Sequence, residues 1–248
     1  MAMTQIIDLT MGIYEGMPQH PAHGRTPLFL SGTRNHEAYK DFKRLNQYDE
    51  TDIISFENEQ IIICGHSGTH MDSCFHGDPE SEYTIDKMPI DCGYGNAVWL
   101  DVSYRFGSKA VVTAKDLKEA EFRSGTKILP GDIVLIFTGW STVNDPIRYS
   151  FEHMGLARDA GEWLREKRVK TVGIDNCNVD AAGELSMPVH MNFLRPRVLG
   201  LPNDDFIAII ENMVNINKIT KSRFTFSGAP IPYIGKTGGQ VRALAIID

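Results

Sequence analysis

The sequence contains no run of about 18 apolar residues, the length that a membrane-spanning helix needs. Its first residues, MAMTQIIDLT, lack the basic start and the long apolar stretch of a secretory signal peptide. It also has no internal repeat and no low-complexity segment. We therefore expect a cytoplasmic protein that neither crosses nor binds a membrane.

The sequence is also poor in cysteine and has no excess of positive charge. None of its four cysteines forms a CxxC pair, which favours free thiols over a disulfide framework. The net charge of −7 argues against nucleic acid or an anionic membrane as the main partner, because an acidic surface repels both.

The 248 residues suggest one α/β domain spanning residues 1–248. Residues 15–52 are rich in Pro, Gly, His and charge and are predicted to form long loops or a lid. Short β-branched and apolar runs predict buried strands at 59–64, 96–102, 132–139, 170–175, 206–211 and 241–247. Strands and helices do not simply alternate, so we expect a mixed central sheet.

Two segments have the pattern of amphipathic helices. For residues 113–125, Thr113 is a candidate N-cap, Asp116 occupies the reciprocal capping-box position and Gly125 is suited to end the helix. Residues 156–168 carry an apolar stripe and predict a second helix.

The segment CGHSGTHMDSCFHGD, residues 64–78, contains three histidines and an aspartate within eleven positions. On a straight strand, residues four apart are separated by about 13 Å. Two nitrogens bound to one ion at about 2 Å each cannot be so distant, so the chain must curl, and Gly65 and Gly68 permit this. Imidazole and carboxylate groups are ordinary ligands of Zn²⁺, Mn²⁺ or Fe²⁺.

The run HSGTHMDSCFH, residues 66–76, resembles the HxGTHxDxPxH signature of the metal-dependent cyclase family, which includes kynurenine formamidases and isatin hydrolases. Further segments resemble the family in its order: IIDLT, PGDIVLIFTGW, VGIDNCNVD, IIENMVNI and GGQVRALAI. The resemblance covers nearly the whole chain. It implies a swivelling β/β/α domain with a central mixed sheet and frequent homo-oligomers, in which the first fifty residues could exchange between subunits.

The resemblance also implies roles for individual residues. The metal ligands would be His66, His70, Asp72, His190 and Glu211, and the general base would be His76. The cofactor would be one or two Mn²⁺ or Zn²⁺ ions.

Two departures from the family pattern stand out. Cys74 occupies the position of the family proline, which would loosen the turn before His76 and leave a thiol near the site. The spacing from His190 to Glu211 is longer than in formamidases, which puts a second metal in doubt.

These residues suit hydrolysis of an amide, a lactam or an activated ester by metal-activated water. The resemblance implies an amidohydrolase that cleaves the C–N bond of an aryl formamide or a cyclic amide such as isatin. Phe75 and Trp140 are candidate aromatic walls of a substrate pocket, with core packing as the alternative for each. Asp175 and Asp180 are expected to hold a loop near the site. Asp180 is also a candidate substrate contact.

Two other functions remain open. His66, His70 and Asp72 also fit the two-histidine, one-carboxylate triad of Fe²⁺ oxygenases. A protein that binds metal without turnover is the third possibility.

Overall fold

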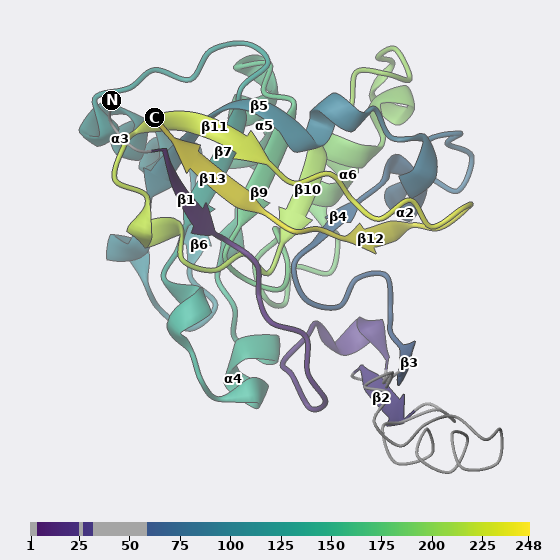
Figure 1. The fold of residues 1–248 in the computed structure, drawn as a ribbon. Coiled ribbons are helices and arrows are strands. Elements are labelled where there is room, and N and C mark those ends of the chain that lie inside the picture. Colours follow the sequence, from purple (N-terminus) through teal and green to yellow (C-terminus); the bar gives the residue numbers. More distant parts are fainter. Residues whose placement is uncertain (1–3, 25–26, 32–58) are drawn as a thin grey trace, which may run out of the picture.

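The computed structural model describes residues 4–24, 27–31 and 59–248. A large curled sheet dominates the described chain (Figure 1). Its nine strands lie in the order β1-β13-β11-β5-β7-β9-β10-β4-β12. Their bounds are Gln5–Asp8 (β1), His70–Asp72 (β4), Tyr94–Asp101 (β5), Ile133–Phe137 (β7), Thr171–Ile174 (β9), Ala208–Glu211 (β10), Arg223–Ser227 (β11), Gly238–Gln240 (β12) and Leu244–Ile247 (β13).

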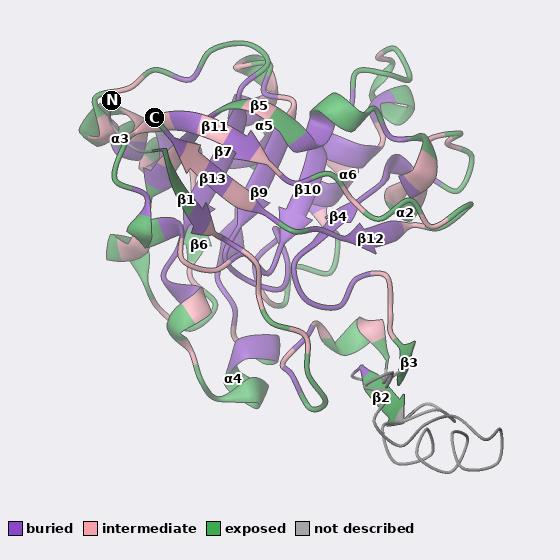
Figure 2. Cartoon of the chain, in the orientation of Figure 1, coloured by how far each residue is buried: buried purple, intermediate pink, exposed green. Residues whose placement is uncertain are grey.

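The sheet is mixed, as the sequence predicts. Strands β5, β7, β9 and β10 pair in parallel at its centre. Antiparallel strands extend it on both sides: β11, β13 and β1 on one, and β4 and β12 on the other. Strands β7, β9 and β10 are buried on both faces, which explains why they appear in the sequence as continuous apolar runs (Figure 2).

Helices cover one face of the sheet. The main helices are α3 (Ala114–Ser124), α5 (Arg158–Glu166) and α6 (Pro188–Leu194), whose apolar side chains pack on the sheet in one core cluster. Shorter elements are α2 (Cys74–Gly77), α4 (Pro146–Phe151) and the two-stranded ladder of β6 (Val111–Val112) and β8 (Gly155–Leu156). Seven 3₁₀ turns, η1 to η7, lie within the described residues.

The other face of the sheet is covered by the curled flanking strands of the same sheet. Alternate residues of β7 divide between the two cores: Val134 and Ile136 face the helices, whereas Ile133 and Leu135 face the second core. The flanking strands and the segment around Ile85 complete this second core. The carboxyl ends of the central strands are thereby left at one edge, the usual place for a site in an α/β fold.

The predicted capping box of α3 is confirmed. The Thr113 hydroxyl accepts from the Asp116 amide, the Asp116 carboxylate accepts from the Thr113 amide, and Gly125 ends the helix with a φ of 67°. The predicted strands at 96–102, 132–139, 170–175 and 206–211 are also found, each shortened or shifted by a few residues.

The prediction of a buried strand at 59–64 is wrong. Residues Glu59–Ile62 form β3, which is exposed along its length and, among the described residues, pairs only with β2 (Leu28–Ser31) in a separate ribbon. Figure 2 shows this ribbon away from the body of the sheet. The apolar run indicates a strand but not its partner. Part of the loop predicted at 15–52, residues 25–26 and 32–52, lies outside the described residues.

The strand predicted at 241–247 is present only as β13, from Leu244 onward. Among the helices of the described residues, none is long and apolar enough to span a membrane.

Candidate metal centre

Strand β4 carries the centre of the site, between β10 and β12. His70 is paired with Glu211 of β10 on one side and with Gln240 of β12 on the other. His70 and Asp72 share one strand face, while Met71 between them points into the second core. The sheet register thus places two predicted ligands from β4 and one from β10 side by side.

The chain curls around this strand as the spacing predicts. His66 lies in a turn before β4, and His76 lies on the single helical turn α2 after it. Gly68 adopts a φ of +65°, a conformation that favours glycine. At Gly238 of β12, a Cβ would lie 2.7 Å from the His66 ring, so the absence of a side chain there makes room for His66.

The donor atoms of these residues converge on Asp72. Its Oδ1 lies 2.7 Å from His66 Nδ1 and 3.3 Å from His70 Nε2. Its Oδ2 lies 3.5 Å from His190 Nε2. Glu211 closes the other side, 3.6 Å from His70 Nε2 and 3.5 Å from His190 Nε2.

These atoms are buried but do not satisfy one another. Within the described residues, His66 Nδ1, His70 Nε2 and both Asp72 oxygens have no hydrogen-bond partner, because the geometry of their contacts is unsuitable. Burying four unpaired polar atoms is costly unless a cation binds them. Two groups of donors could each hold an ion, and they share Asp72: His66, Asp72 and His76, and His70, Asp72 and Glu211. The residues therefore fit one or two divalent cations.

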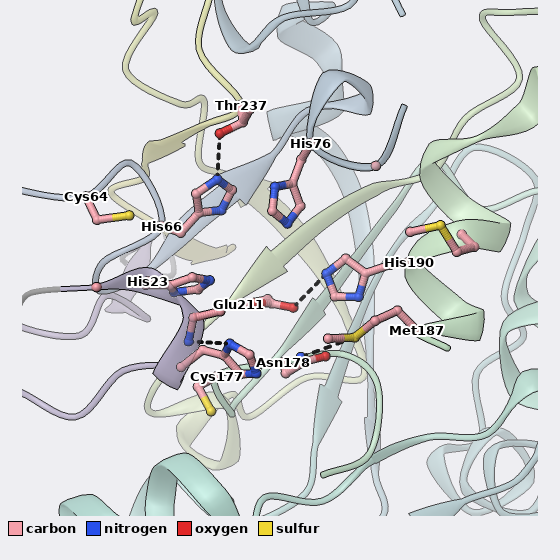
Figure 3. A pocket seen from close by; sticks show the side chains of 15 residues that line it. His23, Cys64, His66, His76, Cys177, Asn178, Met187, His190, Glu211 and Thr237 are labelled. Atoms are coloured by element: carbon pink, nitrogen blue, oxygen red, sulfur yellow. Dashed lines mark hydrogen bonds and ion pairs between the residues drawn. The ribbon is translucent and has the colours of Figure 1, made fainter. Parts of the chain in front are cut away.

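Hydrogen bonds orient the histidines toward this point. His70 Nδ1 lies 2.9 Å from the Gly68 carbonyl, which leaves Nε2 directed at Asp72. His66 Nε2 contacts Thr237 Oγ1 at 2.9 Å, which leaves Nδ1 directed at Asp72 (Figure 3). Such outer contacts fix the tautomer of a ligating histidine.

Asp180 orients His190 in the same way, through a hydrogen bond to its Nδ1. The fully buried carboxylate accepts from His190 Nδ1 at 2.7 Å and from the backbone amides of Val189 and His190 at 2.8 and 3.1 Å. It holds the start of α6 and turns His190 Nε2 toward Asp72 and Glu211. Asp175 instead binds the 138–141 turn through the Thr138 amide and hydroxyl.

The pKa values of these groups diverge. Burial raises the pKa of Glu211 to about 8, with the charge of Asp72 acting in the same direction. Burial opposes ionisation of Asp72, yet the charges of His76 and His66 hold its pKa well below its usual range. His190 is buried, but its bond to Asp180 raises its pKa to about 10. Although His76 is exposed to the cavity, partial burial lowers its pKa to about 4, which leaves the ring neutral and able to accept a proton.

A cavity of about 470 Å³ opens onto these donors. Four of the predicted site residues, His66, His76, His190 and Glu211, line it (Figure 3). Residues that the sequence did not single out also line it: His20, His23, Cys64, Cys177, Asn178, Met187, Met191 and Thr237. The histidine-rich composition of the N-terminal segment could have indicated His20 and His23. Cys64, Met187 and Met191 lie close in sequence to the predicted site residues His66 and His190.

The two predicted aromatic walls are not among the lining residues. Trp140 has no exposed surface, and its indole N–H donates to the Tyr149 carbonyl at 3.0 Å, so it is a core residue. Phe75 is partly buried and precedes His76 on α2, whose turn directs the two side chains differently. Trp140 is therefore assigned to core packing, whereas contact of Phe75 with a substrate stays a prediction.

The departures from the family pattern have little effect on the site. Cys74 points into the second core rather than toward the metal centre, and burial raises the pKa of its thiol to about 12. The long segment between His190 and Glu211 leaves both residues beside Asp72. Arg197 in this segment binds Asp78 at 3.0 Å, at the end of α2.

The fold and the site together define an α/β protein with a histidine- and carboxylate-rich centre suited to divalent cations. The family described as "Putative cyclase" matches residues 7–181. The chain therefore belongs to the Cyclase family.

Relatives and solved structures agree with this assignment. The kynurenine formamidase of Geobacillus thermodenitrificans (strain NG80-2) is 24% identical over 246 residues, covering 97% of each chain. Isatin hydrolase A from Labrenzia aggregata superposes with a TM-score of 0.79 at 18% identity, covering 98% of this chain and 94% of that one. A "predicted metal-dependent hydrolase" from Bacillus stearothermophilus has a TM-score of 0.71 at 23% identity, with 99% of both chains covered. The structural likenesses confirm the expected fold.

Proposed function

We propose that this protein is a metal-dependent hydrolase that cleaves the C–N bond of a small aromatic amide, either linear or cyclic. The observation that carries the proposal is the convergence of buried, unpaired imidazole and carboxylate atoms on Asp72. The activities named for the relatives, kynurenine formamidase and isatin hydrolase, are of this kind. The hydrolase expected from the sequence agrees with those names.

The metal ligands in this proposal are His66, His70, Asp72, His190 and Glu211. A bound divalent cation, Mn²⁺ or Zn²⁺, lowers the pKa of water and polarises a carbonyl group. The protein holds the ligand set rigidly, because Thr237, the Gly68 carbonyl and Asp180 each orient one histidine.

His76 is the proposed general base. Its ring centroid lies 4.3 Å from that of His66 and 5.9 Å from that of His190, at the mouth of the metal centre. A neutral His76 can take a proton from water during attack and return it to the departing nitrogen. Its low pKa keeps it in the accepting form at neutral pH.

Thioethers rather than aromatic rings form the proposed binding surface for the substrate ring. Met187 and Met191 line the cavity on the α6 side (Figure 3 labels Met187). Methionine sulfur packs favourably against aromatic rings and adapts to their shape. The cavity volume of about 470 Å³ falls within the usual range for small-molecule sites, roughly 300–1,000 Å³.

We also propose a single domain over residues 1–248, a cytoplasmic location and a homo-oligomer, as expected from the sequence. An Fe²⁺ oxygenase is less favoured, because Glu211 and His190 lie beside the triad of two histidines and Asp72. The site therefore has more candidate ligands than such a triad needs. An oxygenase would consume O₂, whereas a hydrolase would not.

Ultraviolet absorbance tests the proposal directly. Mn²⁺- and Zn²⁺-loaded protein would be mixed with N-formylkynurenine and with isatin, with chelator-treated protein as the control and O₂ monitored in parallel. We expect turnover of one substrate, sensitive to chelator and without O₂ uptake. Metal-loaded protein that turns over neither substrate nor related amides, lactams and lactones would contradict a hydrolase and favour a binding protein.

The role of His76 needs its own test, since its donor atom also lies within reach of His66 and Asp72. We expect His76→Ala to lower kcat by about 10²–10⁴, the usual value of base catalysis, with metal content unchanged. Metal content would be measured by elemental analysis of the purified variant. Loss of metal would instead identify His76 as a ligand.

A further inference from the structure

The N-terminal segment contributes histidines to the same cavity. His20 precedes the 3₁₀ turn η1 (Pro21–His23) and His23 ends it, and both line the cavity beside the metal centre (Figure 3 labels His23). The His23 ring centroid lies 5.2 Å from that of His66 and 5.9 Å from that of His70. The rings of His66 and His70 are themselves 5.0 Å apart. The distances from His23 to the two proposed ligands are therefore within 1 Å of the spacing that separates those ligands from each other.

A buried side chain ties this turn to the loop that carries His66. The Gln19 amide donates to the Gly24 carbonyl at 3.2 Å, and its oxygen accepts from Ser67 Oγ at 3.0 Å. Gln19 and Ser67 are both buried. Within the turn, the His23 amide donates to the His20 carbonyl at 3.0 Å. The position of His23 is thus fixed relative to its neighbour His66.

His23 also carries a ring nitrogen without a partner in the described part of the chain. Its Nδ1 is buried and has no hydrogen-bond partner among the described residues. By contrast, His66 contacts Thr237, His190 binds Asp180, and His20 Nδ1 accepts from the Ala22 amide. The described residues that line the cavity include no lysine or arginine. The donors that this lining offers a substrate oxygen are therefore imidazole, amide, hydroxyl and thiol groups, among them the ring of His23.

We propose that His23 contacts the substrate and donates a ring N–H to the oxygen of the carbonyl group that water attacks. The inference rests on the hydrolase function proposed above. As the new C–O bond forms, the carbonyl π electrons move onto this oxygen, and the hydrogen bond from His23 strengthens without transfer of its proton. As the carbonyl re-forms, the C–N bond breaks, and its electron pair leaves with the nitrogen, which takes the proton held by His76.

Two variants of metal-loaded protein test the contact. His23→Leu removes the donor, and His23→Gln keeps an amide N–H. We expect His23→Leu to lower kcat by about 10²–10³, as for other donors to a developing oxyanion, with KM changed little. His23→Gln should recover part of this loss. His20→Leu, in the same turn, is the comparison variant and should have a clearly smaller effect.

Metal content and thermal stability of each variant separate this role from others. Both should match the wild type in His23→Leu. Loss of metal would make His23 a ligand, and an unchanged kcat or a rise in KM alone would make it a wall residue. Each of these results overturns the proposal.

A binding measurement distinguishes failure of this inference from failure of the hydrolase function. Calorimetry would compare the binding of an N-aryl phosphoramidate, whose tetrahedral anionic oxygens resemble the intermediate, to wild-type and His23→Leu protein. Weaker binding by His23→Leu supports the contact even if neither protein hydrolyses the substrates tested. Equal behaviour of the two proteins, including no binding by either, overturns it.

Discussion

At the scale of single residues, the site is organised by two aspartates with different tasks. Asp72 faces several ligand atoms with no hydrogen-bond partner of its own in the described structure, which is the arrangement expected of a residue that binds a cation. Asp180 is fully satisfied by one ring nitrogen and two backbone amides. The difference lies in their surroundings, because both side chains are carboxylates buried in the same region.

Asp180→Asn should weaken metal binding without removing a ligand. An amide can accept from only one of the two groups of donors and turns its own N–H₂ toward the other. We expect metal affinity to fall about 10–100-fold, as for other groups that orient metal ligands. Competition with a chelating dye would measure this. Unchanged affinity would show that α6 alone positions His190.

Gly238→Ala should disturb the site through His66. The new Cβ would lie 2.7 Å from the ring, too close for both to keep their positions. We expect weaker metal binding, by about tenfold or more, because the displaced ring also leaves Thr237. Gly12→Ala is the matched control, since no atom lies within 4 Å of its added Cβ. Equal metal affinity of the two variants would contradict this account.

At the scale of elements, local and distant interactions have different roles. Helix α3 is defined by its own caps, and its sequence predicts both of its ends. Helix α2 is a single turn whose position depends on other elements, among them the Arg197–Asp78 ion pair to the segment after α6. Such a short helix has little stability alone, so packing must hold His76 in place.

The α3 capping box should make a pH-dependent contribution to stability. Burial opposes ionisation of Asp116, but hydrogen bonds from the Thr113 amide and hydroxyl lower its pKa. A lowered pKa in the folded state means that this stabilisation is present above the unfolded value of about 3.9 and is lost as the pH falls through the folded value.

Asp116→Asn should therefore lower the free energy of unfolding by about 0.5–2 kcal/mol at pH 7, and the difference should shrink toward acid pH. Urea denaturation at pH 7, 4 and 3 would measure it, because the two acid values lie within about a unit of the carboxyl pKa. Glu119→Gln, on the exposed part of the same helix, is the control and should have little effect. A difference independent of pH would exclude the charge as the cause.

At the scale of the whole molecule, the site joins segments far apart in the chain. The proposed ligands come from β4 and the turn before it, from α6 and from β10, and the cavity is completed by the N-terminal turn and by Thr237 before β12. A cation bound there would link β4, β10 and α6, which are far apart in the sequence. Its binding should consequently stabilise the folded state as a unit.

Metal addition should raise the thermal unfolding temperature of the protein. At a metal concentration of about 100 times Kd the stabilisation is about 2.7 kcal/mol. For a chain of this size that corresponds to roughly 5–10 °C. Differential scanning fluorimetry with and without Mn²⁺ or Zn²⁺ would measure the shift, and His70→Ala should abolish most of it. An equal shift in the variant would place the bound metal elsewhere.

The sequence by itself determined what depends on neighbouring residues. The caps of α3 adjoin the ends of that helix in the sequence. Strand β7 is buried on both faces, so its apolar run is continuous. The short segment that carries His66, His70, Asp72 and His76 was likewise predicted to curl and bind metal, because these residues are close in the sequence. Their positions are linked by covalent geometry, and only a few folded paths bring them together.

Only the tertiary structure decided which distant side chains share the cavity. The pairing of His70 with Glu211 follows from the sheet register, and that register depends on packing across the whole core. Apolar character could not show that Trp140 faces the core or that β3 leaves the sheet, because it encodes a tendency to be covered without naming the partner. The position of His23 also depends on a distant contact. The buried Gln19 ties its turn to the Ser67 loop, more than forty positions further along the chain.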